Sequence, residues 1–303
     1  MPGCLTLLDS PSLWYRAFHA VPASVVSPDG LPTGAVRGFL DLVSRIVRET
    51  RPTRLVATLD LDWRPAFRVA AVPSYKLHRT IGGGAEDEPA SLAPQVAVIL
   101  ELLAALGVPA VGAAGHEADD VIGTLATRAV GAVDVVSGDR DMFQLVRDDG
   151  PVRVLYAVEK MRPYGEAEVA AKYGIPGRSY AEYAVLRGDP SDGLPGVKGV
   201  GDKTAAALVS RFGGVEGLLA ALDAGQQDGF PAGARAKLEA ARDYLATAPA
   251  VTRVVRDLPL PELDDALPRA PRDPAALLAL SDRWGLEAPL ERFLKALEVA
   301  YDG

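Results

Sequence analysis

The pattern that best indicates the fold class is VPAVGAAGHEADDVIGTLATRAVGAVDVVSGDRDMFQLV, residues 108–146. Its apolar periodicity predicts a strand at 108–114, a helix at 117–130, a second strand at 133–139 and a short helix at 141–146. A buried strand, a helix and another buried strand form a βαβ unit, in which the two strands lie parallel. This stretch therefore predicts an α/β fold.

The same alternation extends from the amino terminus to about residue 160. Strands are predicted at 4–9 and 54–60, and helices at 35–49 and 91–107. After the strand-like VRVLYAV (152–158), Gly and Pro interrupt helical segments and no further strand is convincing. We therefore expect an α/β protein with a central, mostly parallel sheet flanked by helices. Residues 1–160 would form its core and residues 161–303 a helical region.

The composition excludes some classes of protein. The chain has 303 residues, 49% of them hydrophobic, which is enough for a full core. No apolar run approaches the roughly 20 residues that span a bilayer, and no signal peptide is recognisable. The single Cys4 excludes an internal disulfide. We expect a cytoplasmic monomer without a membrane partner.

Nine carboxylates follow apolar runs at five places along the chain. They are Asp9, Asp60, Glu117, Asp119, Asp120, Asp139, Asp141, Asp189 and Asp192. Open α/β sheets gather their ligands at the carboxyl ends of the strands, so these acids should meet there. Like charges cannot share a cleft unpaired, and an all-oxygen cluster favours Mg²⁺ or Mn²⁺. Two such ions would activate water for in-line phosphoryl displacement. The net charge of −8 is then a poor argument against a nucleic-acid partner.

Three of the acidic clusters also have a purely structural interpretation, and that of Asp189 and Asp192 is an ordinary turn. Glu117, Asp119 and Asp120 open a predicted helix, where carboxylates favour the helix dipole. Asp139 and Asp141 could form a turn that caps the next helix. The coincidence of all five clusters makes a two-metal site the better hypothesis.

A glycine-rich hairpin at 193–213 follows the last acidic pair. Gly196, Gly199 and Gly201 permit a tight turn between helices, and we expect Gly201 to have a conformation or a close contact that a β-carbon would forbid. Lys198 and Lys203 add positive charge, and the amides at the start of the next helix can bind phosphate. This pattern is typical of a helix-hairpin-helix motif that grips the DNA backbone, although a lone hairpin is more often a simple turn.

A basic run with aromatic residues occupies residues 64–79. Its cations and rings are Arg64, Phe67, Arg68, Tyr75, Lys76, His78 and Arg79. Cations can neutralise phosphates, and rings can stack on bases. A solvated amphipathic helix is the alternative.

These segments, taken in order, carry a family resemblance. LLDSPSLWYRAFHA (7–20), FRVAAVPSYKLHR (67–79), GHEADDVIGTLA (115–126), VVSGDRDMFQLV (135–146) and residues 188–213 resemble the signature segments of the flap endonuclease, or structure-specific 5′-nuclease, family. The likeness is closest to the 5′→3′ exonuclease domain of bacterial DNA polymerase I and its stand-alone relatives, and it covers nearly the whole chain. It implies a PIN-like nuclease core with a helical arch near 64–95.

The resemblance also implies roles for individual residues. A first metal group corresponds to Asp9, Asp60, Glu117, Asp119 and Asp120, and a second to Asp139, Asp141, Asp189 and Asp192. Lys76 and Arg79 match a basic pair at the scissile phosphate, and Tyr75 an aromatic residue that stacks near it. The DNA-binding set is Arg64, Arg68, Tyr75, Gly196, Lys198, Gly199, Gly201, Lys203 and Thr204. The hairpin would hold the downstream duplex and carry a K⁺ ion.

The implied activity is Mg²⁺-dependent cleavage of DNA at 5′ flaps, nicks or free 5′ ends in replication and repair. RNA-DNA primers are a further expected substrate, and the products would be a 5′-phosphate and a 3′-hydroxyl. Two departures leave questions open. The spacing from Asp60 to Phe67 is one residue longer than usual, so Asp62 is an alternative ligand, and the acidic loop 80–91 makes threading of a single strand less secure.

Three rival functions are weighed against this one. A non-catalytic DNA-binding relative would have no need of five intact acidic clusters. A phosphatase of the haloacid dehalogenase type needs a second Asp two residues after Asp9, and residue 11 is Pro. An RNase of a related acidic-site fold remains open.

Overall fold

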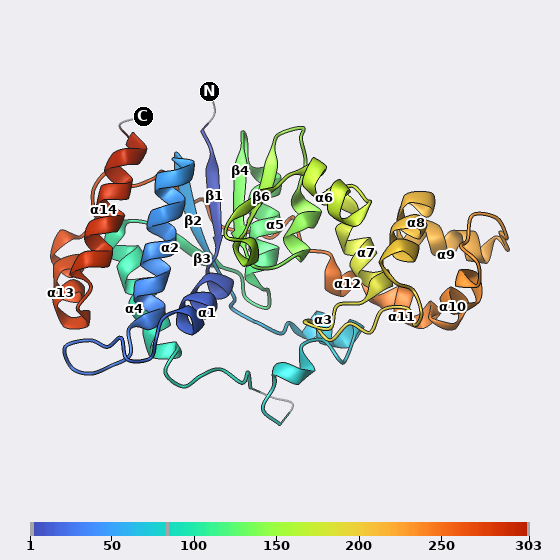
Figure 1. Cartoon of the computed structure of the whole chain (residues 1–303), viewed down its shortest axis with the longest axis horizontal. Coiled ribbons are helices and arrows are strands. Elements are labelled where there is room, and N and C mark those ends of the chain that lie inside the picture. Colours follow the sequence, from blue (N-terminus) through green and yellow to red (C-terminus); the bar gives the residue numbers. More distant parts are fainter. Residues whose placement is uncertain (1–2, 83–84, 302–303) are drawn as a thin grey trace.

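The computed structural model describes residues 3–82 and 85–301, and its centre is one six-stranded sheet (Figure 1). The strands are β1 (Leu5–Asp9), β2 (Arg54–Leu59), β3 (Ala110–Gly112), β4 (Val133–Ser137), β5 (Val152–Tyr156) and β6 (Arg162–Tyr164). Their spatial order is β3-β2-β1-β4-β5-β6. All pairs are parallel except β5 with β6. The α/β fold class with a mostly parallel sheet is thus confirmed.

The central strands are buried on both faces, as expected for a parallel sheet. Every residue of β1 is buried, and Leu7 and Leu8 belong to the cores on opposite faces. The expectation of no strand after residue 158 was wrong, because β6 pairs antiparallel with β5 at the sheet edge. This strand has three residues and contains Pro163, so its sequence carries almost no strand signal.

Five helices cover one face of the sheet. They are α1 (Ser10–Ala20), α2 (Gly34–Thr50), α4 (Ala93–Leu106), α13 (Pro274–Trp284) and α14 (Glu287–Tyr301). Their apolar sides form one core with Leu8, Leu55 and Val136 of the sheet. The last two helices of the chain therefore pack beside the first ones (Figure 1).

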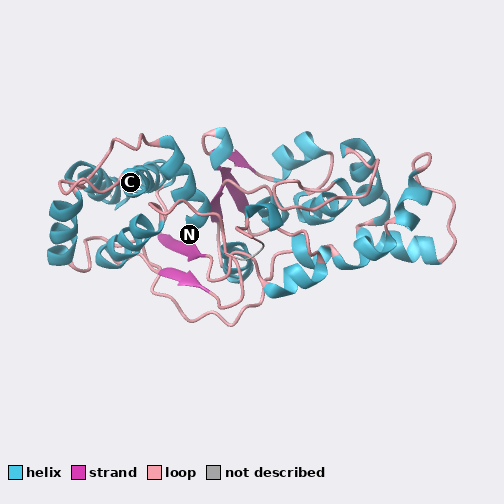
Figure 2. Cartoon of the chain, turned by 90° about the horizontal axis from the view of Figure 1, so that it is seen from below, coloured by secondary structure: helices cyan, strands magenta, loops and turns pink. Residues whose placement is uncertain are grey.

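The opposite face carries α5 (Ala118–Arg128) and most of the helical region. The other helices there are α6 (Glu166–Tyr173), α7 (Tyr180–Arg187), α8 (Asp202–Phe212), α9 (Val215–Asp223), α10 (Ala234–Ala240), α11 (Arg242–Thr247) and α12 (Pro249–Thr252). One continuous core joins them to Leu7 and Val135 of the sheet. Because α8 to α11 extend away from the sheet, the molecule is elongated (Figures 1 and 2).

The connection from β2 to α4 includes residues 64–92, named the arch because they overlap the helical arch predicted near 64–95. It contains the short helix α3 (Ala66–Ala71) and a 3₁₀ turn, η1 (Leu77–Arg79). Gly83 and Gly84, in the acidic loop 80–91, lie outside the described residues. Within the described part of the chain no single helix is long and apolar enough to cross a membrane, and one bent pair, α8 with α9, passes by length and composition alone.

The sheet topology places the carboxyl ends of the strands around one point. The chain leaves β1 toward β2 on one side, and β4 flanks β1 on the other. Asp9 ends β1, Asp60 follows β2, and Asp139 follows β4 by two residues. This is the topological switch point, where α/β proteins bind their ligands.

Candidate active site

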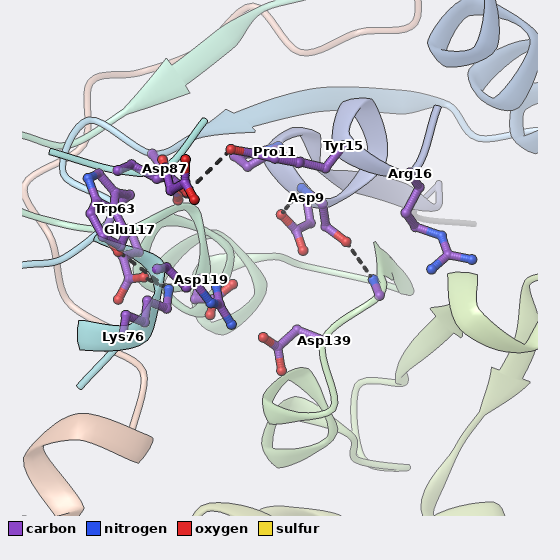
Figure 3. A pocket seen from close by; sticks show the side chains of 15 residues that line it. Asp9, Pro11, Tyr15, Arg16, Trp63, Lys76, Asp87, Glu117, Asp119 and Asp139 are labelled. Carbon is purple, nitrogen blue, oxygen red and sulfur yellow. Dashed lines mark hydrogen bonds and ion pairs between the residues drawn. The ribbon is translucent and has the colours of Figure 1, made fainter. Parts of the chain in front are cut away.

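A cavity of about 490 Å³ opens at this switch point, between α1, the arch, the start of α5 and the end of β4 (Figure 3). Its wall contains the carboxylates of Asp9, Asp60, Glu86, Asp87, Glu117, Asp119 and Asp139 and the cations of Arg16, Lys76 and Arg79. Five predicted metal ligands and both predicted catalytic residues thus share one cavity. Asp62 is not in the wall, and its carboxylate accepts a hydrogen bond from the Arg64 N–H at 3.2 Å.

Two serines fix the acids at the ends of β1 and β4. The Ser137 hydroxyl donates to Asp9 Oδ2, and the Asp139 N–H donates to Ser137 Oγ at 2.8 Å. Ser12, in the first turn of α1, accepts from the Gly138 N–H at 3.0 Å. Asp9 also accepts from the Ser12 N–H, as a helix cap does. These bonds join the two strand ends that carry Asp9 and Asp139.

The start of α5 supplies the next carboxylates. Glu117 is the residue before the helix, and Asp119 lies in its first turn. Asp60 Oδ1 accepts from the Ala118 N–H at 2.6 Å, so the end of β2 is tied to the same helix terminus. The free amides and the dipole of that terminus favour carboxylates there.

Arg68 was predicted to contact DNA, and the structure contradicts this. The side chain is 2% exposed, and its guanidinium donates to Glu117 and to both oxygens of Asp120. Its Nε–H donates to the Val251 carbonyl of α12 at 3.1 Å. A buried guanidinium with these partners cannot reach a phosphate, and it instead compensates two buried carboxylates.

Asp120 is likewise misassigned as a cavity ligand. It is fully buried and absent from the cavity wall, and Oδ1 accepts from Arg68 at 2.6 Å and from the Val255 N–H at 2.9 Å. Its other oxygen faces Arg68 and His116. These protein donors use its lone pairs, so Asp120 supports Glu117 rather than the cavity.

Tyr75 cannot stack on a base, contrary to prediction, because it is 3% exposed and its hydroxyl donates to Glu117 Oε2 at 2.7 Å. Lys76 does face the cavity, where its ammonium donates to Glu117 Oε1. Glu117 therefore accepts from Arg68, Tyr75 and Lys76 at once.

Arg64 donates to the carbonyls of Tyr75 and Pro73 and so stabilises the base of the arch.

Asp139 is the member of the second predicted metal group that lies in the cavity wall, and the other three members lie beside the cavity. Asp141, Asp189 and Asp192 are all buried. Arg140 donates to Asp189 Oδ2 at 2.9 Å, and Arg79 donates to Asp192 Oδ1 at 3.2 Å. Asp141 Oδ1 is buried without a hydrogen-bond partner. An unpaired buried carboxylate oxygen of this kind calls for a proton or a cation.

Burial and mutual repulsion change the acidity of this set. Burial raises the pKa of Asp9 to about 7, and the neighbouring charges of Asp60 and Asp139 add to the rise. Burial also raises the pKa of Asp60 to about 6, although Lys76 opposes the rise. The pKa values of Asp119 and Asp141 are raised in the same way, first by burial and then by Asp139. Several carboxyls would thus bind protons near neutral pH unless cations stabilise their charged forms.

The donor set fits hard divalent cations. Its members are carboxylate oxygens, and the orphaned Asp141 oxygen and the raised pKa values each indicate missing positive charge. Among the described residues, however, no three acidic, His or Cys side chains lie close enough together to hold one ion directly. The carboxylates repel one another, and Glu117 already accepts hydrogen bonds from Arg68, Tyr75 and Lys76. Direct ligation of an ion would therefore require small side-chain movements or bridging waters.

The glycine turns of the hairpin lie between α7 and α8, and no residue of 193–213 lines the cavity. Gly196 has φ 66°, and a β-carbon there would lie 2.5 Å from the Gly188 nitrogen. Gly201 was expected to be equally restricted, and this was wrong: it has φ −100° and would place a β-carbon in open space. Gly199 has φ 78°, and its carbonyl accepts from Lys237 Nζ at 2.9 Å. Lys198 and Lys203 are exposed, and Thr204 is half-buried in α8.

Sequence reasoning missed several residues of the cavity. Ser12 and Arg16 lie one helical turn apart on α1, and Ser12 lies three residues after Asp9, so helical spacing could have found both. Arg16 lies in the wall and donates to the Ala157 carbonyl at 3.0 Å. Glu86 and Asp87 bring the acidic part of the arch into the wall, and Glu86 accepts from the Tyr15 hydroxyl at 3.4 Å.

Known protein families match almost the whole chain. Residues 4–174 match the 5′-3′ exonuclease, N-terminal resolvase-like domain, and residues 175–275 match the 5′-3′ exonuclease, C-terminal SAM fold. A 5′-3′ exonuclease of Streptomyces coelicolor is 52% identical over 299 residues, covering 96% of this chain and 99% of that protein. One of Mycobacterium tuberculosis is 48% identical over 315 residues, covering 98% and 99%.

Longer proteins and solved structures are also similar. The DNA polymerase I of Mycobacterium bovis is 38% identical over 307 residues, and the match covers 98% of this chain but 32% of that polymerase. The 5′-exonuclease of bacteriophage T5 with bound zinc has a TM-score of 0.61 at 18% identity, covering 98% and 99% of the two chains. Flap endonuclease-1 from Methanococcus jannaschii has a TM-score of 0.61 at 18% identity, covering 99% and 92%. These two likenesses concern the fold.

Proposed function

Because this chain belongs to the 5′-3′ exonuclease family, we propose that the acidic cavity is where it hydrolyses DNA phosphodiester bonds with the help of divalent cations. The enzyme is a nuclease, a phosphodiester hydrolase. The observation that carries the assignment is the cavity wall, in which acids from three strand ends and a helix start face Lys76 and Arg79. That arrangement suits charge stabilisation at a phosphate.

The cations are proposed to be Mg²⁺ or Mn²⁺, two or more per site. The T5 relative was solved with divalent metal ions, which supports metal dependence. Asp9, Asp60, Glu117, Asp119 and Asp139 would hold ions in the cavity, and Asp141, Asp189 and Asp192 would hold ions beside it. When bound, such ions activate water and stabilise the charge of an in-line displacement.

The chain's own cations are proposed to hold the scissile phosphate. Lys76 projects into the cavity, and Arg79 and Arg16 reach it from the arch and from α1. Their charges would place the phosphodiester against the carboxylate group and stabilise negative charge that grows on its oxygens. The proposed products are a 5′-phosphate and a 3′-hydroxyl.

The proposed substrates are DNA with 5′ flaps, nicks or free 5′ ends, and RNA-DNA primers, in replication and repair. Structures similar to this chain include the catalytic core of Rad2 in complex with DNA substrate, which supports DNA binding. The hairpin would hold the duplex through Lys198, Lys203 and the amides of α8, with a K⁺ ion. We further propose a monomer that acts in the cytoplasm.

A cleavage assay tests the proposed function. Nicked, flapped and RNA-primed duplexes labelled at either end are incubated with Mg²⁺, with Mn²⁺ and with EDTA. Products that shorten from the 5′ side with either metal and not in EDTA support the proposal. Metal-independent cleavage, or cleavage that starts from 3′ ends, contradicts it.

Substitutions of two hairpin glycines should have different effects, one on DNA binding and the other on folding stability. Gly201→Val places its side chain in open space, so the fold should persist. Duplex affinity should fall about tenfold for every sequence, because the DNA backbone can no longer approach closely. Gly196→Ala, by contrast, should lower the melting temperature, because its β-carbon meets backbone. Fluorescence anisotropy measures the duplex affinity, and thermal melts measure the melting temperature. Unchanged duplex binding by Gly201→Val would show that the hairpin is a structural turn.

The increase in folding stability that Mg²⁺ binding gives should become larger as the pH rises. Burial raises the pKa of Asp9 to about 7 and of Asp60 to about 6, above their unfolded values, so the folded state holds extra protons that it loses as pH rises. Stability without metal should therefore fall between about pH 4 and pH 7. Mg²⁺ at about 100 times its Kd would restore about 2.7 kcal/mol at pH 8, roughly 5–10 °C, and almost nothing at pH 5. Thermal melts at equal ionic strength in NaCl provide the control, and equal protection at both pH values contradicts the prediction.

A further inference from the structure

A second groove, of about 730 Å³, lies between the catalytic cavity and the hairpin. Arg140 at one end of its lining follows Asp139 of the cavity, and Lys203 at the other end belongs to α8. Arg187 and Asp202 line both this groove and a smaller pocket of about 310 Å³ beside Gly201. The groove thus adjoins the hairpin, and its Arg140 is the chain neighbour of Asp139 in the cavity wall.

The charge of the groove is opposite to that of the protein. The chain has a net charge of −8, and the cavity wall is dominated by acids. The groove lining instead has four cations, Arg140, Lys172, Arg187 and Lys203, and two acids, Glu159 and Asp202. A local excess of positive charge in an acidic protein favours an anionic ligand.

Lys172 is the best-fixed cation of the groove. Its ammonium lies 5.0 Å from the ring centre of Tyr164, 5.7 Å from that of Tyr173 and 5.8 Å from that of Tyr156. It donates to the Tyr164 hydroxyl at 2.8 Å and to Glu159 Oε1 at 2.6 Å. These rings hold the charge in place before any ligand arrives, which reduces the entropy lost on binding.

The ion pairs of the groove can be exchanged for a ligand. Lys172 and Glu159 are 39% and 34% exposed, and the Asp202 that pairs with Arg187 is 69% exposed. Exposed pairs of this kind contribute little, so a phosphate can replace the carboxylate at small cost. The half-buried Tyr173 also lines the groove and can offer its hydroxyl group to a phosphate oxygen, whereas Tyr180 and Tyr183 are each 3% exposed and the Tyr183 hydroxyl donates to Asp202 Oδ1 at 2.7 Å.

We propose that this groove, with Lys172 at its centre, binds internal phosphodiesters of duplex DNA along the path from the hairpin to the cavity. The inference rests on the proposed function, because it assumes that the same DNA occupies both ends of the groove. Glu159 then competes with the DNA for Lys172. The two residues should therefore have opposite effects on affinity.

Binding of an internally labelled duplex in Ca²⁺ tests the proposal, with fluorescence anisotropy at 50–200 mM salt. Lys172→Gln should weaken binding about tenfold, the value of one charged hydrogen bond. It should also reduce the slope of log affinity against log salt by about one. Lys172→Arg should retain binding, and Glu159→Gln should tighten it. Lys295→Gln, which removes an exposed lysine on α14 at the other end of the molecule, should change nothing.

The controls separate the possible outcomes. Duplexes with a 5′-phosphate and with a 5′-hydroxyl should lose equal affinity, because internal phosphates are bound; a loss confined to the 5′-phosphate overturns the proposal. Lys172→Gln binding like wild type, or a loss equal to that of Lys295→Gln, also overturns it. If wild type neither binds nor cuts duplex DNA, the proposed function itself has failed. Equal melting temperatures for the variants show that folding is not the cause.

Discussion

Asp139→Asn should reduce Mg²⁺-dependent cleavage by about 10³-fold or more, since loss of a charged ligand can cost several kcal/mol of transition-state stabilisation. Asp139 lies in the wall together with Asp9 and Asp119, and its Oδ1 accepts from the Asp141 N–H at 2.8 Å. Asparagine retains an oxygen that can accept this bond. The substitution should therefore remove charge from the cavity with little change in local structure.

Single-turnover cleavage of a nicked duplex measures this loss, and anisotropy in Ca²⁺ measures binding. DNA affinity should survive, because Asp139 lies in the cavity wall and is not one of the hairpin residues proposed to hold the duplex. Asp148→Asn, at an exposed position outside the cavity, is the matched control and should cut like wild type. Full activity of Asp139→Asn in Mg²⁺ would refute the metal assignment.

Lys76→Ala should slow cleavage by roughly 10²–10³ at saturating DNA, as for other preorganised electrostatic donors. The ammonium lies in the cavity, where charge would grow on the phosphate, and it is fixed by Glu117. Glu117 keeps Arg68 and Tyr75 as partners in the variant. The carboxylate is therefore not left unpaired, and the fold should be retained.

Salt dependence distinguishes this role from simple attraction of DNA. Losing one phosphate contact reduces the slope of log affinity against log salt by about one. Lys198→Ala, at the exposed hairpin, should show that change with little effect on single-turnover rate. Lys76→Ala should instead lower the single-turnover rate and leave the salt slope nearly unchanged. If excess enzyme restores the wild-type rate to Lys76→Ala, Lys76 is a binding residue and its catalytic role is withdrawn.

The fold class was predictable because its signal is local and repeated. Buried runs such as Leu5–Asp9 and Val133–Ser137 alternate with amphipathic helices, and parallel pairing follows from that alternation. The antiparallel β6 was not predictable, because three residues with a central proline have no periodicity. The positions of the acids at strand ends followed from the same pattern.

The network behind the cavity was not predictable from spacing. Arg68 and Lys76 belong to one basic run, and nothing in that run says which cation is buried. The answer depends on Glu117 and Asp120, about 50 residues further along, and on the carbonyl of Val251. Tyr75 was misread for the same reason, since aromatic residues next to cations suit either a core or a nucleic-acid surface.

The hydrogen bonds of Arg68 also limit where recombination can join two such proteins. The family match changes at residue 174, yet Arg68 donates to Val251, and Asp120 accepts from the Val255 N–H. The Leu55 N–H of β2 likewise donates to the Asp265 carbonyl, which belongs to the second matched segment. A recombinant joined at residue 174 would therefore have to place the backbone of residues 251 and 255 as this chain does, or a buried guanidinium and a buried carboxylate would each lose a hydrogen bond. Segments whose packing differs from that of this chain should recombine poorly at this point.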